Sequence, residues 1–86
     1  MLKIALNKKE YTYLCHASFL KDKCKKLLFS IEQHNNIYSL KISENQADEI
    51  RDLCGEQLQL VGFNEKYELN PEGEILESLV DKFFVG

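Results

Sequence analysis

The chain contains 86 residues, of which 44% are hydrophobic and 29% charged, and its formal net charge at pH 7 is −3. A chain of this length can bury one hydrophobic core but not two, so we expect a single domain that spans residues 1–86. The acidic balance argues against a protein that binds nucleic acid through its overall charge.

The N-terminal stretch MLKIALNKKE has too short an apolar run for a secretory signal or a membrane helix, which predicts a cytoplasmic protein. Within it, apolar and polar residues alternate over residues 2–6, as in a short strand or an ordered lead-in. Asn7 and Glu10 have the spacing of a helix N-cap and the glutamate that reaches back to it. Apolar residues at helical spacing follow and predict a helix over residues 8–20. The next segment, KDKCKK, is expected to be an exposed break or a short helical turn.

A change of period predicts a β-hairpin over residues 27–42. The alternating apolar residues are Leu27, Phe29 and Ile31 before the HNN segment, and Tyr38, Leu40 and Ile42 after it. Asparagine tolerates the left-handed backbone of tight hairpin turns, so the turn is expected at Asn35 and Asn36. Because two strands alone are marginal in water, helices must cover the apolar face of this hairpin.

Capping signals predict two amphipathic helices in the second half of the chain. Ser43 and Gln46 form a capping-box pair that begins a helix over residues 43–61. Gly62 is its expected stop, because glycine accepts the left-handed conformation that ends many helices. Its buried stripe is predicted to consist of Ala47, Ile50, Cys54, Leu58 and Val61.

After a short extended piece at Tyr67 and Leu69, Asn70 as N-cap and Pro71 at the first helical position begin a helix over residues 71–84. Its buried stripe is predicted to consist of Ile75, Leu76, Leu79, Val80 and Phe83. These elements together predict an α+β domain in which an antiparallel hairpin or small sheet packs against three or more helices. The expected core residues are Leu14, Phe29, Ile31, Leu40, Ile50, Leu58, Leu76 and Leu79.

Charge is divided unevenly between the two halves of the chain. Residues 1–41 contain eight lysines and three acids, whereas residues 42–86 contain three basic residues and eleven acids. Opposite the buried stripes of the two later helices lie Asp48, Glu49, Asp52 and Glu56 in the first and Glu74, Glu77 and Asp81 in the second. Neutralisation between the halves would account for part of this pattern, and a partner with a basic surface for the remainder.

The acids of the first of these helices are costly to its own stability. Asp48, Asp52 and Glu56 follow one another at four-residue spacing, at which like charges destabilise a helix by about 0.2–0.5 kcal/mol per pair. Arg51 can offset this repulsion at Asp48, but no local neighbour offsets it at the other acids. A basic partner would explain the arrangement, since acids on a rigid helix give fast, salt-sensitive association and can mimic phosphates. The seven acids of the two helices are therefore the candidate partner-binding residues, with a solvated helix face as the alternative for any one of them.

No residue pattern indicates catalysis or a metal site. Cys15 and His16 are adjacent, but helix neighbours point about 100° apart, so we expect Cys15 in the core and His16 near the surface. Cys24 lies among lysines that would lower its pKa, so it is expected to be the most reactive thiol. Three cysteines without a CxxC pair, and only two histidines, fit neither a disulfide framework nor a zinc site. We therefore expect no enzyme activity, no metal and no cofactor.

DNA binding is the alternative function. Lys21, Lys23, Lys25 and Lys26 form a basic cluster next to Phe19. The phrase YELNPEGEILESL is similar to the wing-to-helix phrase of some winged-helix regulators, although no basic recognition helix precedes it. The eleven acids of the second half would repel phosphates.

A small acidic α+β domain with no active site and a helix-rich, acidic second half resembles the immunity proteins that bacteria make against their own toxins, including those of contact-dependent inhibition systems. The resemblance implies tight binding to a toxin domain with a basic surface, such as a nuclease. The protein would cover the active site of the toxin or dock beside it, and it would act without binding nucleic acid or a membrane.

Overall fold

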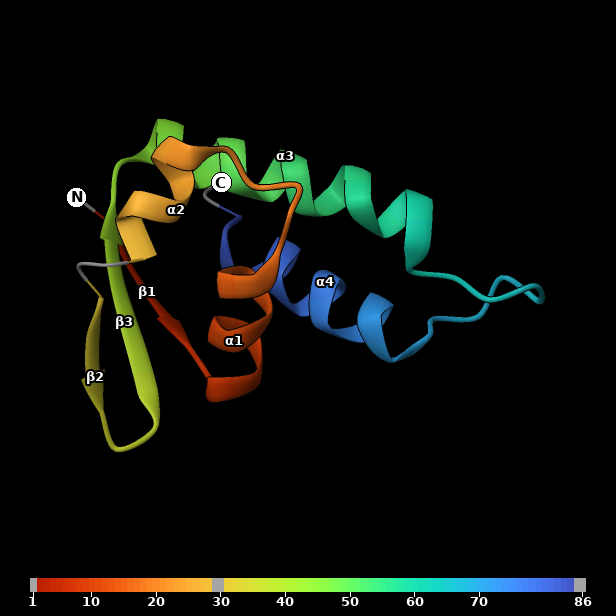
Figure 1. Cartoon of the computed structure of the whole chain (residues 1–86), viewed down its shortest axis with the longest axis horizontal. Helices are drawn as coiled ribbons and strands as arrows, with labels where there is room; N and C mark the ends of the chain where they lie inside the picture. The colour runs from red at the N-terminus through yellow and green to blue at the C-terminus, as the bar shows by residue number, and fades with distance from the viewer. Residues whose placement is uncertain (1, 29–30, 85–86) are drawn as a thin grey trace.

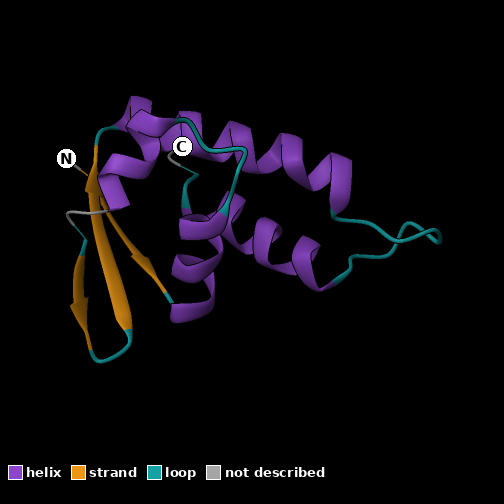
Figure 2. Cartoon of the chain, viewed as in Figure 1, coloured by secondary structure: helices purple, strands orange, loops and turns teal. Residues whose placement is uncertain are grey.

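The computed structural model describes residues 2–28 and 31–84 of the chain. In chain order its elements are β1 (Leu2–Leu6), α1 (Lys8–His16), α2 (Asp22–Leu28), β2 (Glu32–His34), β3 (Ile37–Ile42), α3 (Glu44–Val61) and α4 (Pro71–Lys82). The described residues form a three-stranded antiparallel sheet and four helices, which confirms the predicted α+β fold class (Figure 1, Figure 2).

The sheet has the order β1-β3-β2, and both pairings are antiparallel. The predicted hairpin is confirmed at β2 and β3, whose turn residues Asn35 and Asn36 have φ angles of 51° and 68°. The stretch at residues 2–6 forms strand β1, which pairs with β3 along its whole length, from Leu2 opposite Ile42 to Leu6 opposite Tyr38. The long strand β3 is therefore central, and β2 is a short, exposed edge.

The prediction that the hairpin begins at residue 27 is wrong. Leu27 and Leu28 end helix α2, and the first strand of the hairpin starts only at Glu32. Cys24 and Leu28, four residues apart, are both buried, so the segment places one helical face against the core. The lysine-rich segment, expected to be an exposed break or a short helical turn, is thus a helix with a buried face, whereas Phe29 lies outside the described residues.

Helix α1 begins as predicted and ends earlier than predicted. The capping box is complete, because Asn7 accepts a hydrogen bond from the backbone of Glu10 and the Glu10 side chain accepts one from the backbone of Asn7. The helix stops at His16, since Ala17 adopts an extended conformation with φ −73° and ψ 118°. The turn that follows brings Phe19 to within 6.3 Å of the Tyr13 ring, measured between centroids. Cys15 is exposed, so its predicted place in the core is wrong.

The predicted caps of helices α3 and α4 are confirmed. Ser43 and Gln46 make a reciprocal capping box, and Asn70 accepts a hydrogen bond from the backbone of Gly73 with Pro71 at the start of the helix. Gly62 ends α3 as predicted, but it does not adopt the expected left-handed conformation, since its φ is −82°. Here α3 and the first turn of α4 touch through backbone, and a Cβ on Gly73 would overlap the carbonyl of Gly62.

The core lies between one face of the sheet and the inner faces of the helices. Of the predicted core residues, Leu14, Leu40, Ile50, Leu76 and Leu79 are buried, Ile31 and Leu58 are partly buried, and Phe29 lies outside the described residues. Helices α1, α2 and α4 contact the sheet, and α3 packs along α4. The Tyr11 ring of α1 stacks on the Tyr38 ring of β3 at 4.2 Å.

The molecule is elongated, with extents of 38 × 27 × 25 Å. The sheet lies at one end, the α3–α4 pair extends away from it, and the loop that joins these two helices projects at the opposite end (Figure 1). No helix in the described ranges is long and apolar enough to cross a membrane.

Candidate protein-binding surface

The acids of α3 have different surroundings. The Asp52 side chain is 74% exposed and that of Asp48 46%, and both lie within ion-pair distance of Arg51, at 3.3 and 3.6 Å. Glu56 is exposed, and no ion pair joins it to any described residue. Glu49 is only 24% exposed, because Lys21 and Lys23 of the α2 region bind its carboxylate at 3.4 and 3.3 Å.

The expectation that Asp48 is the one acid whose repulsion is offset by a basic neighbour is therefore wrong. Arg51 forms an ion pair with Asp52 as well. Its guanidinium lies 5.6 Å from the centre of the Phe84 ring, and this contact helps to hold the guanidinium in place. The lysines that bind Glu49 hold the pKa of this carboxyl below its ordinary value of 4.5. Sequence reasoning missed this contact because the two lysines come from another element.

The acids of α4 lie on its outer face. Glu74, Glu77 and Asp81 are exposed, and within the described parts of the chain none of them has an ion-pair partner. Glu72, in the first turn, differs because it accepts a hydrogen bond of 2.6 Å from the Tyr13 hydroxyl of α1. Burial, together with the neighbouring Glu72 charge, raises the pKa of Tyr13.

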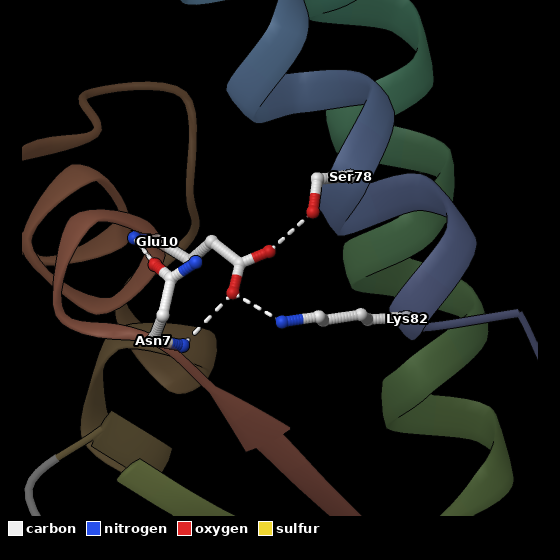
Figure 3. A network of polar contacts seen from close by, with 4 residues as sticks. All are labelled: Asn7, Glu10, Ser78 and Lys82. Atoms are coloured by element: carbon white, nitrogen blue, oxygen red, sulfur yellow. Dashed lines mark hydrogen bonds and ion pairs between the residues drawn. The ribbon is translucent and has the colours of Figure 1, made fainter. Parts of the chain in front are cut away.

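Glu10 is a buried acid, with 2% of its surface exposed. Figure 3 shows its polar partners Asn7, Ser78 and Lys82. Its Oε1 accepts hydrogen bonds from the Asn7 amide at 2.9 Å and from Lys82 Nζ at 2.5 Å, and its Oε2 accepts one of 2.5 Å from Ser78 Oγ. Burial raises the pKa of Glu10, but these hydrogen bonds and the Lys82 charge outweigh burial and lower it below 4.5. The carboxylate therefore joins α1 to α4 as a charged structural group.

The thiols are placed differently from the sequence-based prediction. Cys24 is buried, and burial together with the charge of Glu49 raises its pKa despite Lys21 and Lys23, so the expected reactivity of Cys24 is wrong. Burial raises the pKa of Cys54 to about 12. Cys15 is the exposed thiol.

One open groove, of about 360 Å³, lies where α1 and the turn after it face α3 and α4. Its lining includes Thr12, Tyr13, His16, Phe19, Gln57 and Glu72. Two of its polar groups are engaged with each other, since Tyr13 donates to Glu72. In residues 2–28 and 31–84, no three histidine, cysteine, aspartate or glutamate side chains come together in a way that could hold a metal ion.

No protein-family model, curated protein or solved structure matches this chain. The structure leaves six of the seven predicted acids, Asp48, Asp52, Glu56, Glu74, Glu77 and Asp81, on the outer faces of α3 and α4, and it ties the seventh, Glu49, to two lysines.

Proposed function

We propose that this protein is an inhibitor module of the toxin-immunity type, which binds a partner with a basic surface through the acidic outer faces of α3 and α4. The observation that carries the proposal is the set of exposed acids with no ion-pair partner among the described residues: Glu56 on α3, and Glu74, Glu77 and Asp81 on α4. Lysines are available in the chain, and two of them bind Glu49, yet none binds these four.

Fold stability accounts for only part of this set, since of these acids Glu74 alone lies in the first turn of its helix, where the helix dipole favours an acid. Exposed like charges one turn apart on a helix repel each other, and here Asp52 and Glu56, and likewise Glu77 and Asp81, have this spacing. A partner with complementary charge changes the sign of this effect, because it gains from every acid that a rigid helix presents together. Such acids also steer the encounter, which suits an inhibitor that must capture its target quickly.

The proposed activity is binding without catalysis, in the cytoplasm. The three cysteines are unpaired, as suits a reducing compartment. His16 and His34 are exposed at separate places, one at the end of α1 and the other at the end of β2. Alanine at His16, His34 or Cys15 is therefore expected to leave the biological effect intact, and loss of effect from any one of them in a folded variant would reopen the question of enzyme activity.

The test is affinity capture of the partner from a lysate of the source cell, with protein and nucleic acid both identified, followed by affinity measurements. Asp52→Lys with Glu56→Lys, and Glu77→Lys with Asp81→Lys, are each expected to weaken binding about tenfold or more, which is about 1.4 kcal/mol. The matched control is Asp22→Lys with Glu32→Lys, which changes net charge equally in α2 and β2, outside α3 and α4. Unchanged affinity in both acidic-face variants would refute the proposal.

DNA binding is a second candidate because of the order of the elements. Helices α1 and α2 follow each other with residues 17–21 between them, a hairpin comes next, and β3 pairs back with β1. This is the chain order of a helix-turn-helix with a wing, in which the second helix reads DNA. Against this function, Lys21 and Lys23 are bound to Glu49.

A mobility-shift assay separates the two functions. If α2 binds DNA, Lys25→Glu with Lys26→Glu abolishes the shift, and Glu49→Gln strengthens it by releasing Lys21 and Lys23. If the acidic faces bind a protein, wild type retains no DNA near physiological salt and the lysine variants keep their affinity for the partner.

A further inference from the structure

The loop between α3 and α4 projects from the end of the molecule that is farthest from the sheet (Figure 1). Large apolar side chains are exposed along it and on the last turn of α3. Tyr67 is 87% exposed, Leu60 72% and Phe63 39%. We call these three residues the apical patch. Exposed large apolar side chains on a projecting loop and on the helix turn beside it make this end of the molecule a candidate interaction site.

The loop has a defined conformation. The Asn64 side chain accepts hydrogen bonds from the amides of Lys66 and Glu68, at 2.8 and 3.1 Å, and the Asn64 amide donates to the carbonyl of Glu68 at 2.9 Å. At its base, the Asn70 amide donates to the carbonyl of Gly62 at 3.0 Å. A loop that is ordered before binding loses less conformational entropy when it meets a partner.

Tyr67 is the unusual residue of the loop. Its φ is 62°, a left-handed conformation that glycine and asparagine adopt easily and a bulky residue does not. The sequence pattern had predicted an extended residue here. The Tyr67 ring makes no contact with the described residues that would offset this strain. Folding therefore gives no reason for tyrosine at position 67. An exposed, strained residue in an ordered loop indicates a functional role as a hypothesis to test.

We infer that Tyr67 is an anchor residue that inserts into an apolar pocket of the protein partner, with Leu60 and Phe63 packing around the pocket's mouth. Tyrosine is among the residues that most often dominate binding energy, because it offers a large rigid surface with a polar tip. This inference rests on the proposed protein-binding function. It names the contact that stabilises the complex after charge has steered the two proteins to each other.

The charges around the apical patch indicate which charges should surround the partner's pocket. Glu65 and Glu68 lie in the loop itself, Glu56 lies one helical turn before Leu60, and Lys66 is the basic residue among them. Complementarity thus requires lysine or arginine around an apolar pocket. The same acids make an anionic lipid surface unsuitable, and a second copy of this chain that docked through the same loop would place like charges together.

The test uses the full-length chain with the photo-crosslinking residue p-benzoylphenylalanine at position 67, and at position 37 as a matched control. Ile37 is a suitable control because it is an exposed apolar residue, 44% exposed, on the distant hairpin. We expect position 67 to crosslink to the partner captured by wild type, within a peptide that carries apolar residues next to lysine or arginine, and position 37 to give no such adduct.

Affinity measurements with that partner complete the test. Tyr67→Asn removes the ring and relieves the strain, so it is expected to lower affinity roughly tenfold or more while the melting temperature stays equal or rises. Tyr67→Phe retains most of the affinity. Unchanged affinity of Tyr67→Asn, no adduct at position 67, or an adduct with a second copy of this chain would overturn the inference. If only the acidic-face variants lose binding, the proposed function stands without the anchor, and if neither class of variant does, both fail.

Discussion

The carboxylate of Glu10 is expected to contribute strongly to stability, because it is buried and accepts hydrogen bonds from the N-cap of its own helix and from two residues of α4. Glu10→Gln keeps the size of the side chain but removes its charge, so that Lys82 and Ser78 lose a charged acceptor. We expect the free energy of unfolding in urea at pH 7 to fall by about 2–4 kcal/mol. The matched control Glu74→Gln, on the exposed face of α4, should change it by less than about 0.5 kcal/mol. Equal effects of the two variants would contradict this role.

The same residue predicts a dependence of stability on pH. The pKa of Glu10 is lower in the folded protein than its ordinary value of 4.5, so the folded state favours the ionised form. Its contribution is then fully present above pH 4.5 and is lost as pH falls through the folded pKa. Unfolding titrations should show a constant difference in the free energy of unfolding between wild type and Glu10→Gln above about pH 5, and this difference should shrink below it. A difference that grows on acidification would reverse the sign and exclude this explanation.

Thiol reactivity gives a third prediction for single residues. Cys15 is exposed, whereas burial covers Cys24 and Cys54 and raises the pKa of both. Iodoacetamide should therefore modify Cys15 in the folded protein and all three cysteines only in denaturant, as measured by mass spectrometry. In Cys15→Ser the native protein should remain unmodified. Rapid native labelling of Cys24 would instead support the reactivity that the neighbouring lysines suggested.

For the helices, the contact between the end of α3 and the start of α4 makes the clearest prediction. A methyl group on Gly73 would overlap the backbone of Gly62, so Gly73→Ala is expected to destabilise the fold by about 1–3 kcal/mol. Gly55→Ala is the matched control, because a Cβ there meets no atom within 4 Å and alanine favours a helix interior by up to about 1 kcal/mol. Thermal unfolding should thus shift in opposite directions for the two substitutions, and shifts in the same direction would contradict the close approach.

The elements that the sequence predicted correctly are those whose signals are local. The pairs Asn7 with Glu10 and Ser43 with Gln46 are three residues apart, and the hairpin turn needs only Asn35 and Asn36. Each feature satisfies backbone groups of its immediate neighbours, so short patterns identify it.

The features that the sequence did not predict depend on contacts between distant elements. Glu10 was recognised as a capping residue, but its partners Ser78 and Lys82 lie 68 and 72 positions away. For helix α2 no more than a short helical turn was expected, because Leu27 and Leu28 fit a strand period as well as a helical one, and burial of Leu28 in the core favours the helix. The charge of Glu49 was read as free, since nothing in its own helix shows that Lys21 and Lys23 approach it.

Over the whole molecule, charge differs between the elements, and exposed apolar side chains lie at one end. The sheet, α1 and α2 carry most lysines, α3 and α4 carry most acids, and the apical patch lies at the end away from the sheet. A basic partner would be oriented by this asymmetry before contact, since surface potential acts at longer range than packing. The acids and the patch are therefore expected to control different steps of binding.

Stopped-flow association kinetics with the captured partner can separate these steps. For wild type, we expect the association rate to fall by about tenfold or more as salt rises from about 0.1 to 1 M, because the screening length shortens from about 10 to 3 Å. Glu77→Lys with Asp81→Lys should slow association at low salt and flatten this dependence, since exposed charges act mainly on the approach. Tyr67→Asn should leave the association rate and its salt dependence in place and raise the dissociation rate, because a buried ring acts after contact. A salt-independent association rate in wild type would exclude charge as the means by which this protein finds its partner.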